Sequence, residues 1–141
     1  MPQIDNYVLD SYALIGYLED EPFAEWLQQL LLSARHGQCR LYVHAIQLGE
    51  VYYITLREQG KTIADLAYAR IKAFPVVVID AIDEKLLLSA ASLKAIFPVS
   101  YADAFAAALA GLHDAVLLTG DPEFEALEKK GLLSIEWLNR L

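Results

Sequence analysis

Four acidic side chains stand at positions where a divalent metal centre can be built. Asp10 directly follows the apolar run 7–9, and Asp121 follows a second apolar run, 115–118, after Thr119 and Gly120. The carboxyl ends of parallel strands meet at one edge of an open α/β sheet, so these two carboxylates are expected to share a crevice. A set made only of carboxylates suits a hard cation such as Mg²⁺ or Mn²⁺, rather than zinc or copper.

Glu50 and Asp103 add two acids to this set from segments that are expected to be buried helices. Glu50 lies four residues from both Ile46 and Ile54 and shares their apolar stripe. Asp103 is followed by the apolar stretch 104–112, which offers no polar face. A buried, ionised carboxylate without a partner costs several kcal/mol, so it is normally neutralised, paired or bound to a cation.

Each acid also has a simpler interpretation. Asp10 and Asp121 are suited to capping helices at strand-to-helix turns, and Asp103 is suited to a capping box with Ser100. Glu50 lies on the same helical face as Arg57, which is also compatible with a solvated edge. Taken singly, each simple role is at least as good as metal binding. The four positions taken together favour the metal site.

The elements that must position these acids alternate between short β-rich runs and longer helical patterns. Strands are expected at 7–9, 41–43, 76–79, 115–118 and 134–137, and helices at 11–19, 21–34, 45–59, 62–73, 84–96, 100–113 and 122–130, with Ser11, Ser100 and Asp121 as N-terminal caps. Three strands are almost continuously apolar, as in sheets covered on both faces. The prediction is α/β: one three-layer α/β/α domain, residues 1–141, around a mainly parallel sheet of about five strands.

Composition narrows the class of protein further. The chain has 141 residues, 56% of them hydrophobic, and a net charge of −8, which together exclude disorder and argue against holding nucleic acid by broad charge attraction. The apolar run 104–112 is too short to span a bilayer, and no signal peptide is recognisable, so a cytoplasmic location is expected. Cys39 is the single cysteine, which excludes an intramolecular disulfide and favours a buried small side chain.

Four blocks of the sequence resemble the signature segments of PIN-domain ribonucleases, and especially of VapC-type toxins. They are residues 7–15 (YVLDSYALI), 48–51 (LGEV), 100–110 (SYADAFAAALA) and 118–124 (LTGDPEF), which follow the order of the family across nearly the whole chain. The resemblance implies a PIN-like fold. It also implies that Asp10, Glu50, Asp103 and Asp121 form the acidic site of a ribonuclease that depends on Mg²⁺ or Mn²⁺.

The resemblance extends to neighbouring positions, with two departures. Ser11 and Thr119 match small hydroxyl residues that the family often has near the site. The family often places Ser or Thr shortly before the glutamate, where this chain has the segment 45–47 (AIQ). Glu123 stands where the family often has a further aspartate just after the fourth acid. These departures concern the residues that surround the principal acids.

The resemblance further implies hydrolysis of RNA, with tRNA as one target class, by the toxin of a type II toxin–antitoxin pair. It implies a cognate antitoxin that blocks the acidic crevice with a basic residue, and a homodimer without a membrane role. The alternative from another class is a non-catalytic α/β module that binds a partner and retains the acidic cluster. A receiver-like domain and an Asp-x-Asp phosphatase fit less well, because their additional acids and lysine are missing.

Other chemistry-bearing residues give weaker signals. The three histidines, His36, His44 and His113, have no ligand spacing between them and are expected at surface or strand-end positions. Four tyrosines adjoin the acidic blocks and could stack on bases, although packing is the stronger expectation: Tyr12, Tyr52, Tyr53 and Tyr101. The glycines near the blocks stand singly, so a nucleotide-binding Gly-rich loop is not indicated.

Overall fold

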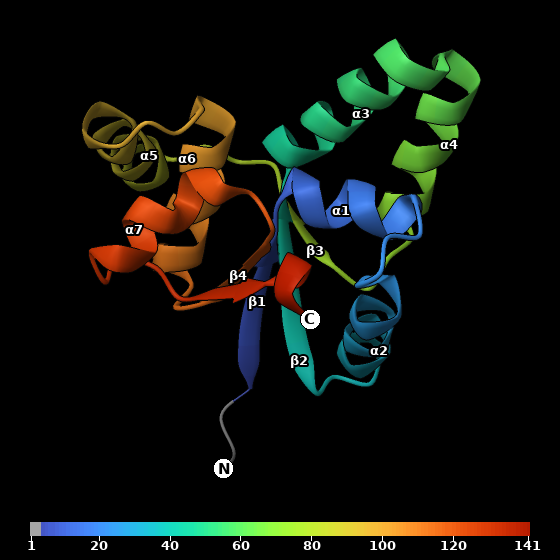
Figure 1. Ribbon diagram of the computed structural model, residues 1–141, viewed down its shortest axis with the longest axis horizontal. Coiled ribbons are helices and arrows are strands. Elements are labelled where there is room, and N and C mark those ends of the chain that lie inside the picture. Colours follow the sequence, from blue (N-terminus) through green and yellow to red (C-terminus); the bar gives the residue numbers. More distant parts are fainter. Residues whose placement is uncertain (1–3) are drawn as a thin grey trace.

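A parallel five-stranded sheet lies between two layers of helices in the computed structural model, which describes residues 4–141 (Figure 1). The strands are β1 (Asp5–Leu9), β2 (Cys39–His44), β3 (Val77–Ile79), β4 (Val116–Thr119) and β5 (Ile135–Trp137). All five lie where the sequence predicts strands, and every neighbouring pair is parallel. The predicted three-layer α/β/α architecture is confirmed.

Seven α-helices and two short 3-10 helices are found within residues 4–141. They are α1 (Ser11–Leu18), α2 (Ala24–Arg35), α3 (Ala45–Gln59), α4 (Lys61–Lys72), α5 (Glu84–Ile96), α6 (Tyr101–Leu112), η1 (Pro122–Phe124), α7 (Glu125–Lys129) and η2 (Leu138–Arg140). The helices α1 to α4 lie on one side of the sheet and α5 to α7 on the other, as Figure 1 shows. Two of them, α3 and α5, have the bounds that the sequence predicts.

Each face of the sheet has its own apolar core, which explains why the strands read as continuous apolar runs. Val8 and Leu117 pack into the core beneath α5 and α6. Their neighbours Leu9 and Leu118 point the other way, into the core beneath α1 and α2. Because successive side chains of a strand alternate between faces, a sheet covered on both sides needs apolar residues at nearly every position.

The order of the strands determines where a site can form. The sheet runs β3-β2-β1-β4-β5, so the chain first builds outward from β1 to β3 and then returns to place β4 on the other side of β1. The connections after β1 and β4 therefore leave the sheet in different directions. Ligand sites of open α/β sheets lie at such a switch point, outside the carboxyl ends of the strands.

The caps differ from the sequence prediction at one helix. Asp10, and not Ser11, is the N-cap of α1: its carboxylate accepts a hydrogen bond from the backbone N–H of Ala13, while Ser11 is the first helical residue. The prediction of a Ser11 cap was wrong, because the carboxylate of the preceding residue already reaches the free N–H. The predicted caps Ser100 and Asp121 are confirmed. The segment predicted as one helix at 122–130 is divided into η1 and α7.

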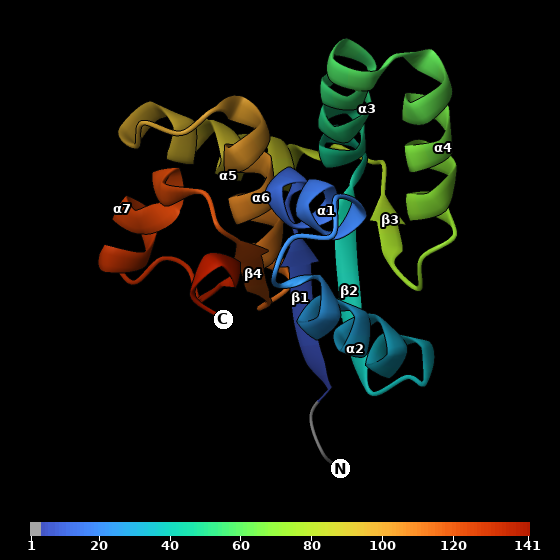
Figure 2. The same ribbon diagram turned by 45° about the vertical axis from the view of Figure 1, so that its right-hand side comes forward.

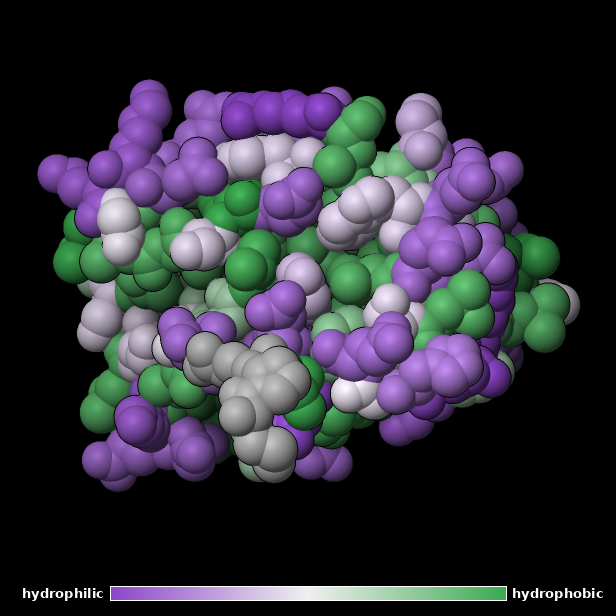
Figure 3. Space-filling model, turned by 90° about the horizontal axis from the view of Figure 1, so that it is seen from below, coloured by the Kyte–Doolittle hydropathy of each residue, from purple (hydrophilic) through white to green (hydrophobic). Residues whose placement is uncertain are grey.

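The two ends of the sheet differ in shape. At the carboxyl end, α3 and α4 run side by side and project beyond the strands, as Figures 1 and 2 show. At the opposite end, near the start of β1, hydrophilic and hydrophobic side chains are intermixed on the surface (Figure 3). Among the helices of residues 4–141, none has the length and apolar character needed to cross a bilayer.

Candidate metal centre

The backbone of β1 and β4 brings two of the predicted acids to the same edge of the sheet. Leu9 pairs with Leu118, so Asp10 leaves the sheet directly beside Thr119, two residues before Asp121. Asp10 is 1% exposed and Asp121 is half-buried. The sequence prediction that these carboxylates meet at the ends of adjacent strands is consistent with this register.

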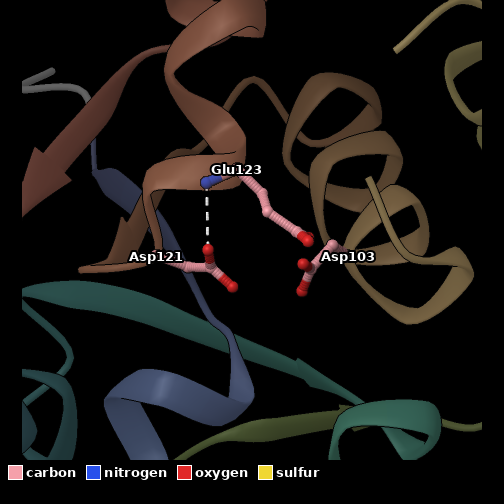
Figure 4. Close-up of side chains that lie close together, drawn as sticks. All are labelled: Asp103, Asp121 and Glu123. Carbon is pink, nitrogen blue, oxygen red and sulfur yellow. Dashed lines mark hydrogen bonds between the residues drawn. The ribbon is translucent and has the colours of Figure 1, made fainter. Parts of the chain in front are cut away.

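The tightest cluster joins Asp103, Asp121 and Glu123. One carboxylate oxygen of each residue lies within 4.8 Å of the corresponding oxygens of the other two. Figure 4 shows Asp103 reaching from α6 toward Asp121 and Glu123, which lie at the start of η1. Asp103 is 7% exposed, so its carboxylate lies at the inner wall of the site. Three acids from two separate segments therefore converge within the reach of a single cation.

Local hydrogen bonds hold these acids without using all of their oxygens. Asp121 Oδ1 accepts a hydrogen bond from the backbone N–H of Glu123 at 2.9 Å, and the Thr119 hydroxyl accepts one from the Asp121 N–H at 3.0 Å. Ser100 Oγ accepts the backbone N–H of Asp103 at 3.1 Å, so the Asp103 carboxylate takes no part in that cap. The capping roles of Asp10 and Asp121 are therefore real, whereas the capping box of Asp103 with Ser100 does not form, because the Ser100 N–H donates to Glu123 instead. The Asp103 carboxylate stays free to face the cluster.

Burial and neighbouring negative charges disfavour ionisation of Asp10. Burial raises the pKa of Asp10 to about 7, against the opposing hydrogen bonds of Thr119 and Ala13, and the charges of Asp121 and Glu50 add to the rise. A carboxyl group with such a pKa is partly protonated at neutral pH. This is the behaviour expected where a cation replaces protons.

Asp103 and Glu50 are shifted in the same direction. Burial also raises the pKa of Asp103, and a hydrogen bond with Glu123 and the neighbouring acids raise it further. Burial raises the pKa of Glu50 as well, with Ser11 opposing the shift and Asp121 and Glu123 adding to it. Electrostatic repulsion therefore connects all five acids, which are Asp10, Glu50, Asp103, Asp121 and Glu123. Asp10 and Glu50 nevertheless lie outside the tight trio.

The donor set fits a hard divalent cation. Within residues 4–141, no Lys or Arg nitrogen lies within 4.0 Å of any of the five carboxylates. The salt bridge in this part of the chain joins two other residues, Lys61 and Asp65. Glu50 Oε1 is buried and has no hydrogen-bond partner among the described residues. Buried charges are normally paired or coordinated to metals. Oxygen-only ligands are those that Mg²⁺ and Mn²⁺ take.

Four of the five acids, all except the buried Asp10, line a crevice of about 530 Å³ at the carboxyl end of the sheet. Its acidic lining includes Glu50, Asp103, Asp121 and Glu123, and Glu19 and Glu21 extend it outward. Its hydroxyl groups come from Ser11, Tyr12 and Ser100. Within the described part of the chain, no Lys, Arg or His lines this crevice. An anionic ligand must therefore be neutralised there by a cation that the carboxylates hold.

Glu123 has a more central position than the sequence indicates. The sequence places Glu123 beside the site with Ser11 and Thr119, whereas the structure puts its carboxylate within the tight trio. Its longer side chain also accepts a hydrogen bond from the Ser100 backbone N–H at 3.4 Å, which links η1 to the start of α6. The signal available in the sequence was its position two residues after Asp121, at the first turn of a helix.

Gln47 and His44 are two buried polar residues whose hydrogen bonds the sequence does not reveal. Gln47 is 1% exposed, and its amide Nε2 donates to the carbonyl oxygen of Ala102 at 2.9 Å. It thereby ties α3, one turn before Glu50, to the residue that precedes Asp103. His44 ends β2, as expected of a strand-end residue, and its ring Nδ1 accepts the Ile46 N–H to cap α3.

Replacing Gln47 with leucine is expected to weaken the binding of Mn²⁺ severalfold. The variant keeps a similar volume but removes the bond that spaces α3 from α6, at a cost of about 1 kcal/mol in unfolding free energy. Isothermal titration with Mn²⁺ measures the affinity, and Gln29→Leu, an exposed glutamine of α2, is the matched control. Equal Mn²⁺ affinities of the two variants would show that Gln47 does not support the metal centre.

The PIN domain family model matches residues 7–130 of this chain. No protein of curated function matches the chain by sequence. The fold is similar to that of VapBC2 from Rickettsia felis bound to a promoter DNA fragment, with a TM-score of 0.73, 18% identity and coverage of 93% of this chain and 97% of that chain.

Two further solved structures share the fold. VapBC-1 from nontypeable Haemophilus influenzae matches with a TM-score of 0.70, 23% identity and coverage of 95% and 98% of the two chains. A toxin–antitoxin complex from Klebsiella pneumoniae matches with a TM-score of 0.65, 15% identity and coverage of 94% and 97%. These similarities agree with the family model, which spans all four predicted acids: Asp10 after β1, Glu50 within α3, Asp103 in the first turn of α6 and Asp121 after β4. The chain belongs to the PIN-domain family.

Proposed function

We propose that this protein is a metal-dependent endoribonuclease, and that it acts as the toxin of a type II toxin–antitoxin pair. One observation carries the proposal: the carboxylates of Asp103, Asp121 and Glu123 converge within reach of one cation at the switch point of the sheet, and no Lys or Arg of residues 4–141 pairs with them. Asp10 and Glu50 are close enough to this trio to interact with it electrostatically. The PIN-domain match and the structural similarity to a toxin–antitoxin complex support the nuclease and toxin assignments.

The acids would have different roles at the metal site according to their positions. Asp103, Asp121 and Glu123 would hold the Mg²⁺ or Mn²⁺ ion, and Asp10 and Glu50 would complete its surroundings directly or through water. When bound, a divalent ion supplies Lewis-acid stabilisation of phosphate oxygens and lowers the pKa of water. Glu50, whose Oε1 is buried and has no hydrogen-bond partner among the described residues, would orient the attacking water. Thr119, which is fully buried, accepts the Asp121 backbone N–H and so helps to position the start of η1.

Cleavage of RNA tests this proposal. Purified protein should cleave a labelled single-stranded RNA in the presence of Mg²⁺ or Mn²⁺, and EDTA should abolish the cleavage. A DNA strand of the same sequence is the control for substrate class. Saturable metal binding without cleavage of single-stranded RNA or of a tRNA pool would instead support the non-catalytic binding module.

A cognate antitoxin is the partner that the surface favours. A groove of about 450 Å³ between α1, α3 and α4 has a mixed lining: apolar side chains that include Leu18, Ile63 and Leu66, and polar ones that include Glu19 and Arg70. It shares Ile15 and Glu19 with the acidic crevice, so the two hollows adjoin. An antitoxin segment with an apolar face and a basic end would cover both. The predicted homodimer would be measured by light scattering of the isolated chain.

A further inference from the structure

Tyr12 presents the exposed aromatic ring of the acidic crevice. It is the second residue of α1, two positions after Asp10, and it lines the crevice while remaining 39% exposed. Its ring stacks on that of Phe23, with centroids 5.9 Å apart and planes inclined by 22°. Phe23 also lines the crevice but is only 4% exposed, so it supports Tyr12 from below rather than meeting a ligand itself.

Two glycines leave room for this pair of rings. A Cβ built on Gly120 would overlap the Tyr12 ring, and a Cβ built on Gly16 would overlap the Phe23 ring. Gly120 immediately precedes Asp121, so the Tyr12 ring lies directly beside one of the clustered acids. The ring lies against Phe23 and against Gly120, which follows β4, and 39% of the residue remains exposed. An aromatic side chain fixed in this way loses little conformational entropy when it stacks on a ligand.

The charge of the crevice limits how it can bind RNA. A phosphate backbone normally gains its affinity from Lys and Arg, yet no basic side chain lines this crevice within residues 4–141. The carboxylates outside the trio, including Glu19 and Glu21, would repel the flanking phosphates. Stacking of a base on an aromatic ring needs no positive charge and accepts any base.

We propose that Tyr12 forms a nucleobase subsite beside the metal centre, where its ring stacks on a base that flanks the scissile phosphate. The inference rests on the proposed ribonuclease function and names how its site holds the substrate. The stacked base places the adjacent phosphate over Asp103 and Asp121. Because the contact exists before and during the reaction, its loss raises KM and leaves kcat nearly unchanged.

Abasic substrates test this subsite. The substrate is a short single-stranded RNA that the enzyme cleaves at one bond. A set of variants of this RNA is prepared, each with a single abasic ribose at one of the nucleotides that flank this bond. For the wild type, one of these substitutions should raise KM on the order of tenfold, which corresponds to the loss of one stacked base. Tyr12→Leu should raise KM for intact RNA by a similar factor and show no further loss on that abasic substrate. Tyr12→Phe should retain the wild-type pattern.

Controls separate this inference from folding and from the nuclease assignment. Tyr53→Leu removes a tyrosine of α3 that is 46% exposed and does not line the crevice, so its KM should equal that of the wild type. The Mn²⁺ affinity of Tyr12→Leu should be unchanged. Gly120→Ala, which displaces the ring without removing it, should raise KM in the same direction.

Three results would overturn the inference. The first is a wild-type KM for Tyr12→Leu on intact RNA. The second is a Tyr12→Leu variant that remains as sensitive as the wild type to every abasic position, which would make Tyr12 a packing residue only. The third is a wild type that binds Mn²⁺ but cleaves no RNA, in which case the proposed function fails and the subsite with it.

Discussion

Asp103→Asn is expected to abolish cation-dependent RNA cleavage, with a loss on the order of a thousandfold. A metal ion supplies several kcal/mol of stabilisation to the transition state, and each 1.36 kcal/mol is worth about tenfold in rate. Asp103 belongs to the tight trio with Asp121 and Glu123, so its replacement removes a charged ligand from the inner wall. Initial rates of RNA cleavage at saturating Mg²⁺ and at saturating Mn²⁺ measure the effect.

The same variant should fold normally. Asparagine has the shape of aspartate, and its amide group donates to the neighbouring carboxylates instead of repelling them. Metal-free Asp103→Asn is therefore expected to unfold at a higher temperature than the wild type above neutral pH. Unchanged cleavage by this variant would show that Asp103 is not a ligand of the catalytic metal ion.

Asp10 gives a matched pair of variants. Asp10 Oδ1 accepts the Ala13 N–H at 2.9 Å, and asparagine also caps helices well whereas alanine does not. Asp10→Asn should therefore lose cleavage and keep its stability, while Asp10→Ala should lose both, with about 1 kcal/mol less unfolding free energy. If Asp10→Asn and Asp103→Asn both cleave like the wild type, the assignment of these carboxylates to the catalytic site is refuted.

The stability of the metal-free protein should fall as pH rises from about 4 to about 7. The pKa of Asp10 rises from 3.8 to about 7 on folding, and those of Asp103 and Glu50 rise as well. In this window the native state retains protons that the unfolded chain has released, so increasing pH favours unfolding. Thermal unfolding in a chelator, at about pH 5, 6, 7 and 8, measures this slope.

Mn²⁺ should reverse the trend. Protons compete with the cation for the same oxygens, so Mn²⁺ should raise the melting temperature more at about pH 8 than at about pH 5. Asp10→Asn should flatten the profile. Asp65→Asn is the control, because Lys61 lowers the pKa of the exposed Asp65 and keeps its titration below this window. A metal-free melting temperature that is constant from pH 5 to pH 8 would contradict the account.

Most of the fold could be predicted from local sequence. The apolar runs that became β1, β2 and β4 indicate a sheet covered on both faces, and this coverage is what the two cores show. The predicted bounds of α3 and α5 agree with the structure, in which Gly60 is the C-cap of α3 and Asp83 is the N-cap of α5. These features depend on residues within a few positions of one another.

The contacts that assemble the site were not predictable in the same way. Gln47 reads as an ordinary helical residue, and only the packing of α3 on α6 shows that its amide meets the Ala102 carbonyl. Glu123 was placed beside the site because its reach depends on the turn at η1. Ser11 was assigned the cap that Asp10 makes, because the sequence permits either residue. Side-chain reach between distant segments is set by tertiary packing.

Isothermal titration of the metal-free protein with Mn²⁺ tests the central claim, that these carboxylates together bind a divalent cation. The account predicts saturable binding to the wild type at about pH 8, marked weakening in Asp103→Asn and in Asp121→Asn, and unchanged binding in Asp65→Asn, whose carboxylate lies outside the crevice. Absence of saturable binding to the wild type, or equal affinities in all four proteins, would contradict it.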